Sequence, residues 1–139
     1  MHSPSLAHDY VRRAGIRLGA IDVLFAAESW ADVVRECQEV VELALKGLLR
    51  AHGVEPPRIH DVSDVLLAER ERFPAVLARE VDDLAETSRR LRRDRELAFY
   101  GAEDLTPSGF YSRRDAEDAR DRARRTVAVV TPHVPAPSS

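Results

Sequence analysis

The chain has 139 residues, enough for one domain with a substantial hydrophobic core. Its net charge of −3 gives no overall basic field, so any contact with nucleic acid has to be local. The single cysteine excludes an internal disulfide framework and fits a reducing compartment. No apolar run reaches the roughly 18 residues of a spanning helix, and the first residues carry no secretory signal. We therefore expect a cytoplasmic protein without membrane contact.

The first half of the chain predicts two long helices. Residues 5–28 repeat apolar side chains every three or four positions, and Gly15 and Gly19 within them are expected to let a neighbouring helix approach closely. Residues 31–52 carry the widest apolar stripe, and Cys37 on that stripe is expected to pack in the core. The connection between the two segments is so short that they should form an antiparallel hairpin.

A proline-containing loop follows at residues 54–62 and holds His60. We interpret His60 as a residue that orients the loop; the alternatives are a catalytic base and a metal ligand. No second histidine or cysteine stands at ligand spacing, so no metal site is expected. Ser63 is expected to cap a short helix over residues 64–72.

The second half predicts two more long helices. Pro74 suits the first position of a helix over residues 74–98. Residues 101–111 predict a loop. Ser112, with an acidic residue three positions later, is typical of a helix start and predicts a helix from about residue 113 to 131.

These elements together predict the architecture. No segment alternates convincingly as a strand, and no glycine-rich phosphate loop is present. We expect an all-α protein, an antiparallel up-and-down four-helix bundle with one extra short helix, over residues 1–131. The proline-rich residues 132–139 are expected to form a disordered tail.

The end of the fourth predicted helix, residues 89–101 (RRLRRDRELAFYG), is dense in arginine. At about 100° per residue, one face gathers four polar side chains: Arg89, Arg93, Glu96 and Tyr100. Arg95 falls on a second, mostly apolar face. Since burying an unpaired charge is costly, Arg95 there requires a carboxylate, a second subunit or a bound anion as partner. The alternative is a solvated, arginine-rich helix end.

Three stretches, taken in order, resemble the HEPN family (higher eukaryotes and prokaryotes nucleotide-binding). The first is VVRECQEVVELALKGLLRAHG in the second helix, which contains Lys46. The second is the loop PPRIHDV, which contains His60. The third is RELAFYG, residues 95–101, followed by an acidic loop, a proline and a Tyr-Ser-x-x-Asp-Ala helix start at Tyr111. The resemblance covers nearly the whole chain.

This resemblance implies a four-helix bundle that commonly forms a homodimer, with its polar residues in a cleft at the dimer interface. It implies a nucleotide or RNA ligand, no cofactor, and a minimal nucleotidyltransferase as partner in a toxin–antitoxin-type pair. Carried over residue by residue, the ligand-binding positions are as follows: Arg93, Arg95, Tyr100, Lys46 and His60.

Active HEPN ribonucleases pair an arginine with a histidine shortly after it, and this chain departs from that pattern. Counting from Arg93, Ala98 stands where the histidine belongs; counting from Arg95, Tyr100 does. The resemblance is therefore to a subgroup that lacks the ribonuclease histidine, and we expect a binding or interaction module without catalysis. One alternative is a variant toxin endoribonuclease that uses Arg95, Glu96 and Tyr100. A second alternative is a helical oligomer without a ligand.

Overall fold

The structure, a computed structural model, describes residues 4–58, 62–100 and 107–137; for residues 94–100 and 107–108 it describes the backbone only. Within these ranges every regular element is helical and no strand occurs, which confirms the expected all-α class. None of the helices in the described ranges is long and apolar enough to cross a bilayer.

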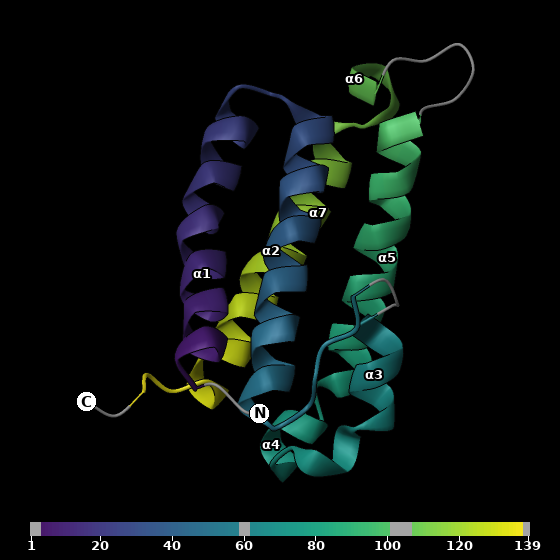
Figure 1. The fold of residues 1–139 in the computed structure, drawn as a ribbon. Helices are drawn as coiled ribbons and strands as arrows, with labels where there is room; N and C mark the ends of the chain where they lie inside the picture. The colour runs from purple at the N-terminus through teal and green to yellow at the C-terminus, as the bar shows by residue number, and fades with distance from the viewer. Residues whose placement is uncertain (1–3, 59–61, 101–106, 138–139) are drawn as a thin grey trace.

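Two long helices open the chain: α1 (Pro4–Ala26) and α2 (Trp30–Ala51). They run antiparallel and pack along their length, which confirms the expected hairpin (Figure 1). The expected ranges, residues 5–28 and 31–52, differ from the observed helices only at their ends. In Figure 1, α1 and α5 flank α2 on opposite sides, and α7 lies behind. The central position of α2 is what its wide apolar stripe requires.

Short elements precede the third long helix: α3 (Val62–Ala68), η1 (Arg70–Arg72), α4 (Ala75–Ala78) and α5 (Val81–Tyr100). The expected single helix over residues 74–98 is therefore wrong. The N–H of Glu80 donates to the carbonyl of Leu77, three residues back, and this tight turn at 2.9 Å closes α4 before α5 begins. Pro74 is the N-cap of α4 and not its first helical residue. The short helix expected over residues 64–72 is likewise divided into α3 and η1.

The chain ends in three further elements: α6 (Pro107–Phe110), α7 (Arg113–Val130) and η2 (Thr131–His133). The predicted helix start at Ser112 is confirmed. Ser112 Oγ accepts the N–H of Asp115 at 3.2 Å, and the Asp115 carboxylate accepts the N–H of Ser112 at 2.9 Å. α6 lies at the end of the expected loop, whose residues 101–106 are outside the described part. Helical structure continues past residue 131 into η2, and Val134 is buried, at 4% exposure.

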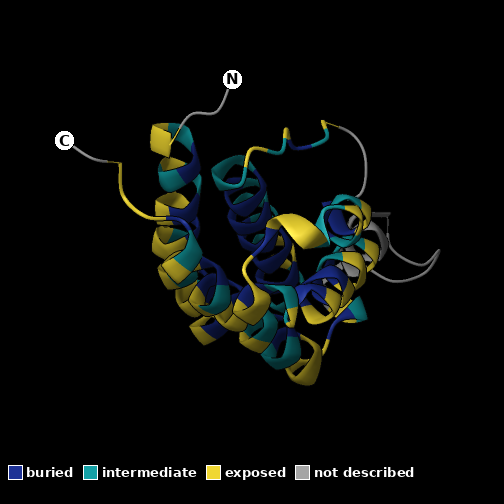
Figure 2. Ribbon diagram, turned by 90° about the horizontal axis from the view of Figure 1, so that it is seen from below, coloured by how far each residue is buried: buried dark blue, intermediate teal, exposed yellow. Residues whose placement is uncertain are grey.

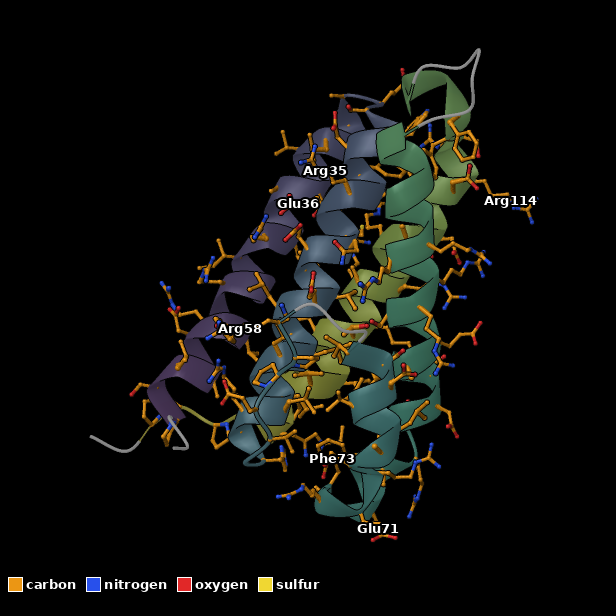
Figure 3. All side chains as sticks on the ribbon, turned by 45° about the vertical axis from the view of Figure 1, so that its right-hand side comes forward. Arg35, Glu36, Arg58, Glu71, Phe73 and Arg114 are labelled. Carbon is orange, nitrogen blue, oxygen red and sulfur yellow. The ribbon has the colours of Figure 1, made fainter. Side chains whose placement is uncertain are left out.

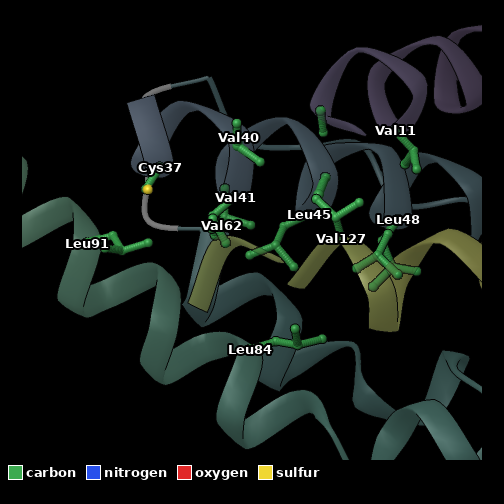
Figure 4. Close-up of a cluster of buried hydrophobic side chains, with 14 of the residues drawn as sticks. Val11, Cys37, Val40, Val41, Leu45, Leu48, Val62, Leu84, Leu91 and Val127 are labelled. Atoms are coloured by element: carbon green, nitrogen blue, oxygen red, sulfur yellow. The ribbon is translucent and has the colours of Figure 1, made fainter. Parts of the chain in front are cut away.

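The hydrophobic core lies between α2 and the helices around it. From α2 it takes Val33, Val34, Cys37, Val40, Val41, Ala44, Leu45, Leu48 and Leu49, all at most 1% exposed. Figure 4 shows part of this cluster, with Leu84 and Leu91 from α5, Val127 from α7 and Val11 from α1 around α2. Buried residues lie on the inward faces of the helices, and exposed residues lie on their outer faces (Figure 2). One helix therefore organises the whole core.

Close approach between α1 and α2 depends on Gly47, a residue of α2. A Cβ at Gly47 would lie 2.7 Å from Cγ2 of Val11 and 3.0 Å from the carbonyl oxygen of Ala7, both on α1. By contrast, a Cβ at Gly15 or Gly19 would meet nothing within 4 Å. The expectation that these two glycines admit a neighbouring helix is therefore wrong for the isolated chain, because their face of α1 points away from the bundle.

We predict opposite stability changes for two Gly→Ala variants. Gly47→Ala should lower the free energy of unfolding by about 1–3 kcal/mol, because α1 has to shift to admit the methyl group. Gly15→Ala should raise it by up to about 1 kcal/mol, because alanine favours an exposed helix interior. Urea denaturation of both variants at low protein concentration measures the two changes. Equal effects would contradict the packing described for Gly47.

Cys37 is fully buried, as expected for a core residue. Loss of solvation raises the pKa of its thiol to about 12. The unfolded thiol ionises near its ordinary pKa of about 8.5. Since the folded-state pKa is the higher one, this thiol's contribution to stability is complete below about pH 8.5 and is lost as pH rises towards 12.

We predict that wild type and Cys37→Ala converge in stability at alkaline pH. At neutral pH the alanine variant should be less stable, because it leaves a cavity. Above about pH 8.5 wild type should lose up to about 1.4 kcal/mol per pH unit that the variant keeps. Denaturation curves of both proteins at several pH values measure this difference. A gap that stays constant up to pH 11 would contradict the prediction.

Candidate functional site

A small cleft lies where α2, the start of α3 and α5 meet. We call it the α2–α5 cleft, and its lining residues are Gln38, Val41, Glu42, Val62, Ser88, Leu91 and Arg92. It has about 250 Å³ of empty space, which includes open solvent at its mouth, and only about 10 Å³ of this space admits the centre of a water molecule. A volume of this size holds about one water. A larger ligand would therefore lie across the mouth of the cleft.

The α2 wall of the cleft carries Gln38 and Glu42, and Lys46 follows one turn further along α2. Gln38 Nε2 donates to Oε2 of Glu42 at 2.9 Å, and Lys46 Nζ lies 3.2 Å from the other carboxylate oxygen of Glu42. Each oxygen of this carboxylate therefore has a partner, and Lys46 balances its charge. Because of these two contacts, Glu42 does not present an uncompensated negative charge to the cleft.

The α5 wall carries Ser88, Leu91 and Arg92. Leu91 is buried in the core, and Arg92 is half-buried at the rim. No described residue forms an ion pair with Arg92. A guanidinium offers five N–H donors in a planar arrangement that suits carboxylate and phosphate groups. Arg92 is therefore the cation of the described cleft that is available to an anionic ligand.

Arg89 ties α5 to the start of α3. Its Nε donates to Oγ of Ser63 at 3.0 Å, and its Nη2 donates to the carboxylate of Asp64 at 2.9 Å. Ser63 is completely buried within the first turn of α3. The expectation that Ser63 caps this helix is wrong, because α3 already begins at Val62. The serine hydroxyl instead accepts a hydrogen bond from Arg89 of α5, and this bond connects α3 to α5 at one end of the cleft.

The structure describes the side chains of only some of the expected site residues. Lys46 lies beside the cleft but is paired with Glu42. Arg93 is exposed, as is Arg89 on the same face of α5, in agreement with the predicted helical face. The remaining expected site residues have side chains outside the described part of the structure: His60, Arg95, Glu96 and Tyr100. What they contribute to the cleft stays a prediction.

The sequence reasoning missed Arg92 and Gln38. Arg92 follows Ser88 by one turn, so helical spacing places it next to Ser88 and Leu91 on the side of α5 that lines the cleft. Gln38, Glu42 and Lys46 stand four positions apart on the second helix, a spacing that places three polar groups in line. Both patterns were visible in the sequence.

A second and larger hollow, with about 640 Å³ of empty space, lies between α1 and α2 and is less suited to an anion. Its lining is Arg17, Leu24, Asp32, Arg35, Glu36 and Glu39. Arg17 donates to both oxygens of Glu36, at 2.6 and 3.3 Å, and this contact raises the pKa of the arginine. Figure 3 shows Arg35 and Glu36, successive residues along α2. With three carboxylates against two guanidinium groups, this hollow would repel a phosphate.

The described residues support neither a cysteine nucleophile nor a metal site. Cys37 is buried, and a thiol with a pKa of about 12 is not a nucleophile at neutral pH. Among the residues placed by the structure, no three histidine, cysteine or acidic side chains are grouped as a metal site would require.

Comparisons with known proteins agree on one family. The sequence model of the HEPN domain matches residues 7–132. No curated protein matches. Among solved structures, the chain is similar to the crystal structure of an archaeal HEPN homologue, with 21% sequence identity and a TM-score of 0.71, over 93% of this chain and 98% of the other. At this identity the structural likeness supports the fold.

We predict that Arg89→Gln loosens the start of α3 without unfolding the protein. Because Arg89 is half-exposed, the loss in overall stability should stay near 1 kcal/mol or below. The amides of the first turn of α3 should exchange with solvent faster. Arg125→Gln is the matched control, since Arg125 forms exposed ion pairs with Asp83 and Glu80 away from α3. Equal exchange at α3 in both variants, measured by mass spectrometry, would contradict this role of Arg89.

Proposed function

The chain belongs to the HEPN family, and on that premise we propose that it is a nucleotide- or RNA-binding module whose α2–α5 cleft holds a phosphate group. Family membership supports a nucleotide- or RNA-related role. The observation that carries the assignment to this cleft is Arg92, a rim guanidinium without a described ion-pair partner, opposite a carboxylate that Lys46 already balances.

The geometry supports binding at the mouth of the cleft. The interior has room for about one water, so the base and sugar of a ligand lie outside it. Arg92 then contacts the phosphate through paired N–H groups, the arrangement in which guanidinium binds such oxygens most strongly. We propose that Arg93, Arg95 and Tyr100 on α5 and its continuation, with Lys46 and His60, extend this contact along the ligand.

The proposal includes the partners that the family resemblance implies. The protein forms a homodimer and acts with a minimal nucleotidyltransferase in a toxin–antitoxin-type pair. We place it in the cytoplasm, which agrees with a single buried cysteine that forms no disulfide. A reading frame for a small nucleotidyltransferase next to this gene, and co-purification of the two proteins, would support the pairing.

We predict that ATP and a short single-stranded RNA bind wild type, and that Arg92→Ala weakens this binding at least about tenfold, a loss of about 1.4 kcal/mol. Isothermal titration calorimetry measures both affinities. Binding should also weaken as salt is raised, because the contact is with phosphate. Arg79→Ala is the control, since Arg79 is an exposed arginine just before α5 and outside the cleft.

Three outcomes decide between functions. Heat with ATP or RNA that Arg92→Ala reduces and Arg79→Ala preserves supports the binding module. No heat with either ligand overturns the proposed ligand and leaves a helical oligomer. Shortened RNA on a gel after incubation with wild type, but not with Tyr100→Phe, would replace the binding module with the variant endoribonuclease.

A further inference from the structure

Arg89 lies beside Arg92 on α5, next to the mouth of the α2–α5 cleft. Residues three positions apart on a helix are neighbours, about 4.5 Å apart along the axis and about 60° apart around it. α3 packs against α5 here (Figure 1), and its first residue, Val62, lines the cleft. Arg89 contacts the next two residues of α3, Ser63 and Asp64. One phosphate group at the mouth can therefore reach both guanidinium groups.

The described contacts of Arg89 use only part of its hydrogen-bonding capacity. Its Nε donates to Oγ of Ser63 at 3.0 Å, and its Nη2 donates to Oδ1 of Asp64 at 2.9 Å. A guanidinium has further N–H groups beyond these two. Ser63 is completely buried, and its bond holds the Nε side of the guanidinium in place. The Nη groups can therefore bind a ligand while the bond to Ser63 is kept.

Asp64 is a weakly held partner of Arg89. The side chain of Asp64 is 73% exposed, and that of Arg89 is 49% exposed. An ion pair in such a position contributes little, because water solvates both charges and salt screens them. A phosphate group carries more charge and accepts two N–H bonds at once, whereas Asp64 accepts one from Arg89. A phosphate at the cleft mouth therefore displaces the Asp64 carboxylate into solvent.

We propose that Arg89 is a second phosphate-binding residue of the α2–α5 cleft, and that Asp64 competes with the ligand for it. The inference rests on the proposed function, adds a second guanidinium to Arg92, and identifies a carboxylate of the chain that limits the affinity of the site. Binding replaces the contact between Arg89 and Asp64 by a contact between Arg89 and phosphate. Two guanidinium groups match a ligand with two or more negative charges, such as the phosphate chain of ATP.

Two variants that break the same ion pair separate this role from a purely structural one. Asp64→Asn and Arg89→Gln both remove the ion pair between α3 and α5, so a structural role would change the affinity for ATP in the same direction. Competition predicts opposite directions. Asp64→Asn should raise the affinity about two- to fivefold, because the competitor is gone. Arg89→Gln should lower it about five- to tenfold, because a charged donor is lost. Isothermal titration calorimetry measures both affinities.

Another ion pair of α5 gives the matched control. Asp82 pairs with Arg70 of η1, and the side chain of Asp82 is 76% exposed, close to the value for Asp64. Asp82 lies about two turns before Arg89 and outside the cleft. Asp82→Asn removes the same charge and should leave the affinity for ATP within about twofold of wild type. In the double variant Asp64→Asn/Arg89→Gln, the gain from Asp64→Asn should disappear, because Arg89 is absent.

Inorganic tripolyphosphate tests whether the arginines bind the phosphate chain itself. It has no base or sugar, so Asp64→Asn and Arg89→Gln should change its affinity in the same directions as for ATP. Effects on ATP alone would place the change at the base or sugar and would overturn the role of Arg89.

The outcomes separate this inference from the proposed function. Opposite effects of Asp64→Asn and Arg89→Gln support it, as does ATP binding that is measurable only in Asp64→Asn. Effects in the same direction, or an equal gain in Asp82→Asn, overturn it, while a loss of affinity in Arg92→Ala keeps the cleft as the binding site. No ATP binding in wild type and in Asp64→Asn overturns the proposed ligand and this inference together.

Discussion

The burial of α2 on several sides at once is the constraint from which the other features of this fold follow. Its core residues from Val33 to Leu49 are at most 1% exposed, and α1, α7 and α5 each pack against it. A helix that is apolar around so much of its circumference is stable only when neighbours cover it. Gly47 allows α1 to pack closely against α2, because a methyl group at this position would collide with Val11 and with the carbonyl oxygen of Ala7.

Contacts of charged side chains then determine how the outer helices are oriented around α2. On one side, Arg122 links Thr87 of α5 to Asp118 of α7, and Arg125 reaches Asp83 and Glu80. On the other side, Arg120 of α7 stacks over the ring of Phe25 at 3.7 Å. Surface ion pairs of this kind each contribute little to stability. Their value lies in orientation, since they select one rotation of each helix about its own axis.

The candidate site follows from the same arrangement. α5 contacts α2 and α3 more than α7, so its polar residues gather where those two helices meet. Arg89 holds α3 in place through Ser63 and Asp64, and Arg92, almost one turn further on, faces the cleft.

Helical periodicity and short sequence motifs determined much of this protein. Periodicity placed the two helices of the hairpin and the inward positions of α2, with Cys37 among them. Motifs identified the capping box at Ser112 and the HEPN family, and both are confirmed. Periodicity says which residues share a face, but not which way that face turns or where a helix breaks. The turn between α4 and α5, the outward direction of Gly15 and Gly19, the burial of Ser63 and the place of Arg92 at the cleft were therefore decided by tertiary packing. These features depend on neighbours distant in sequence, whose contacts a single-chain pattern does not contain.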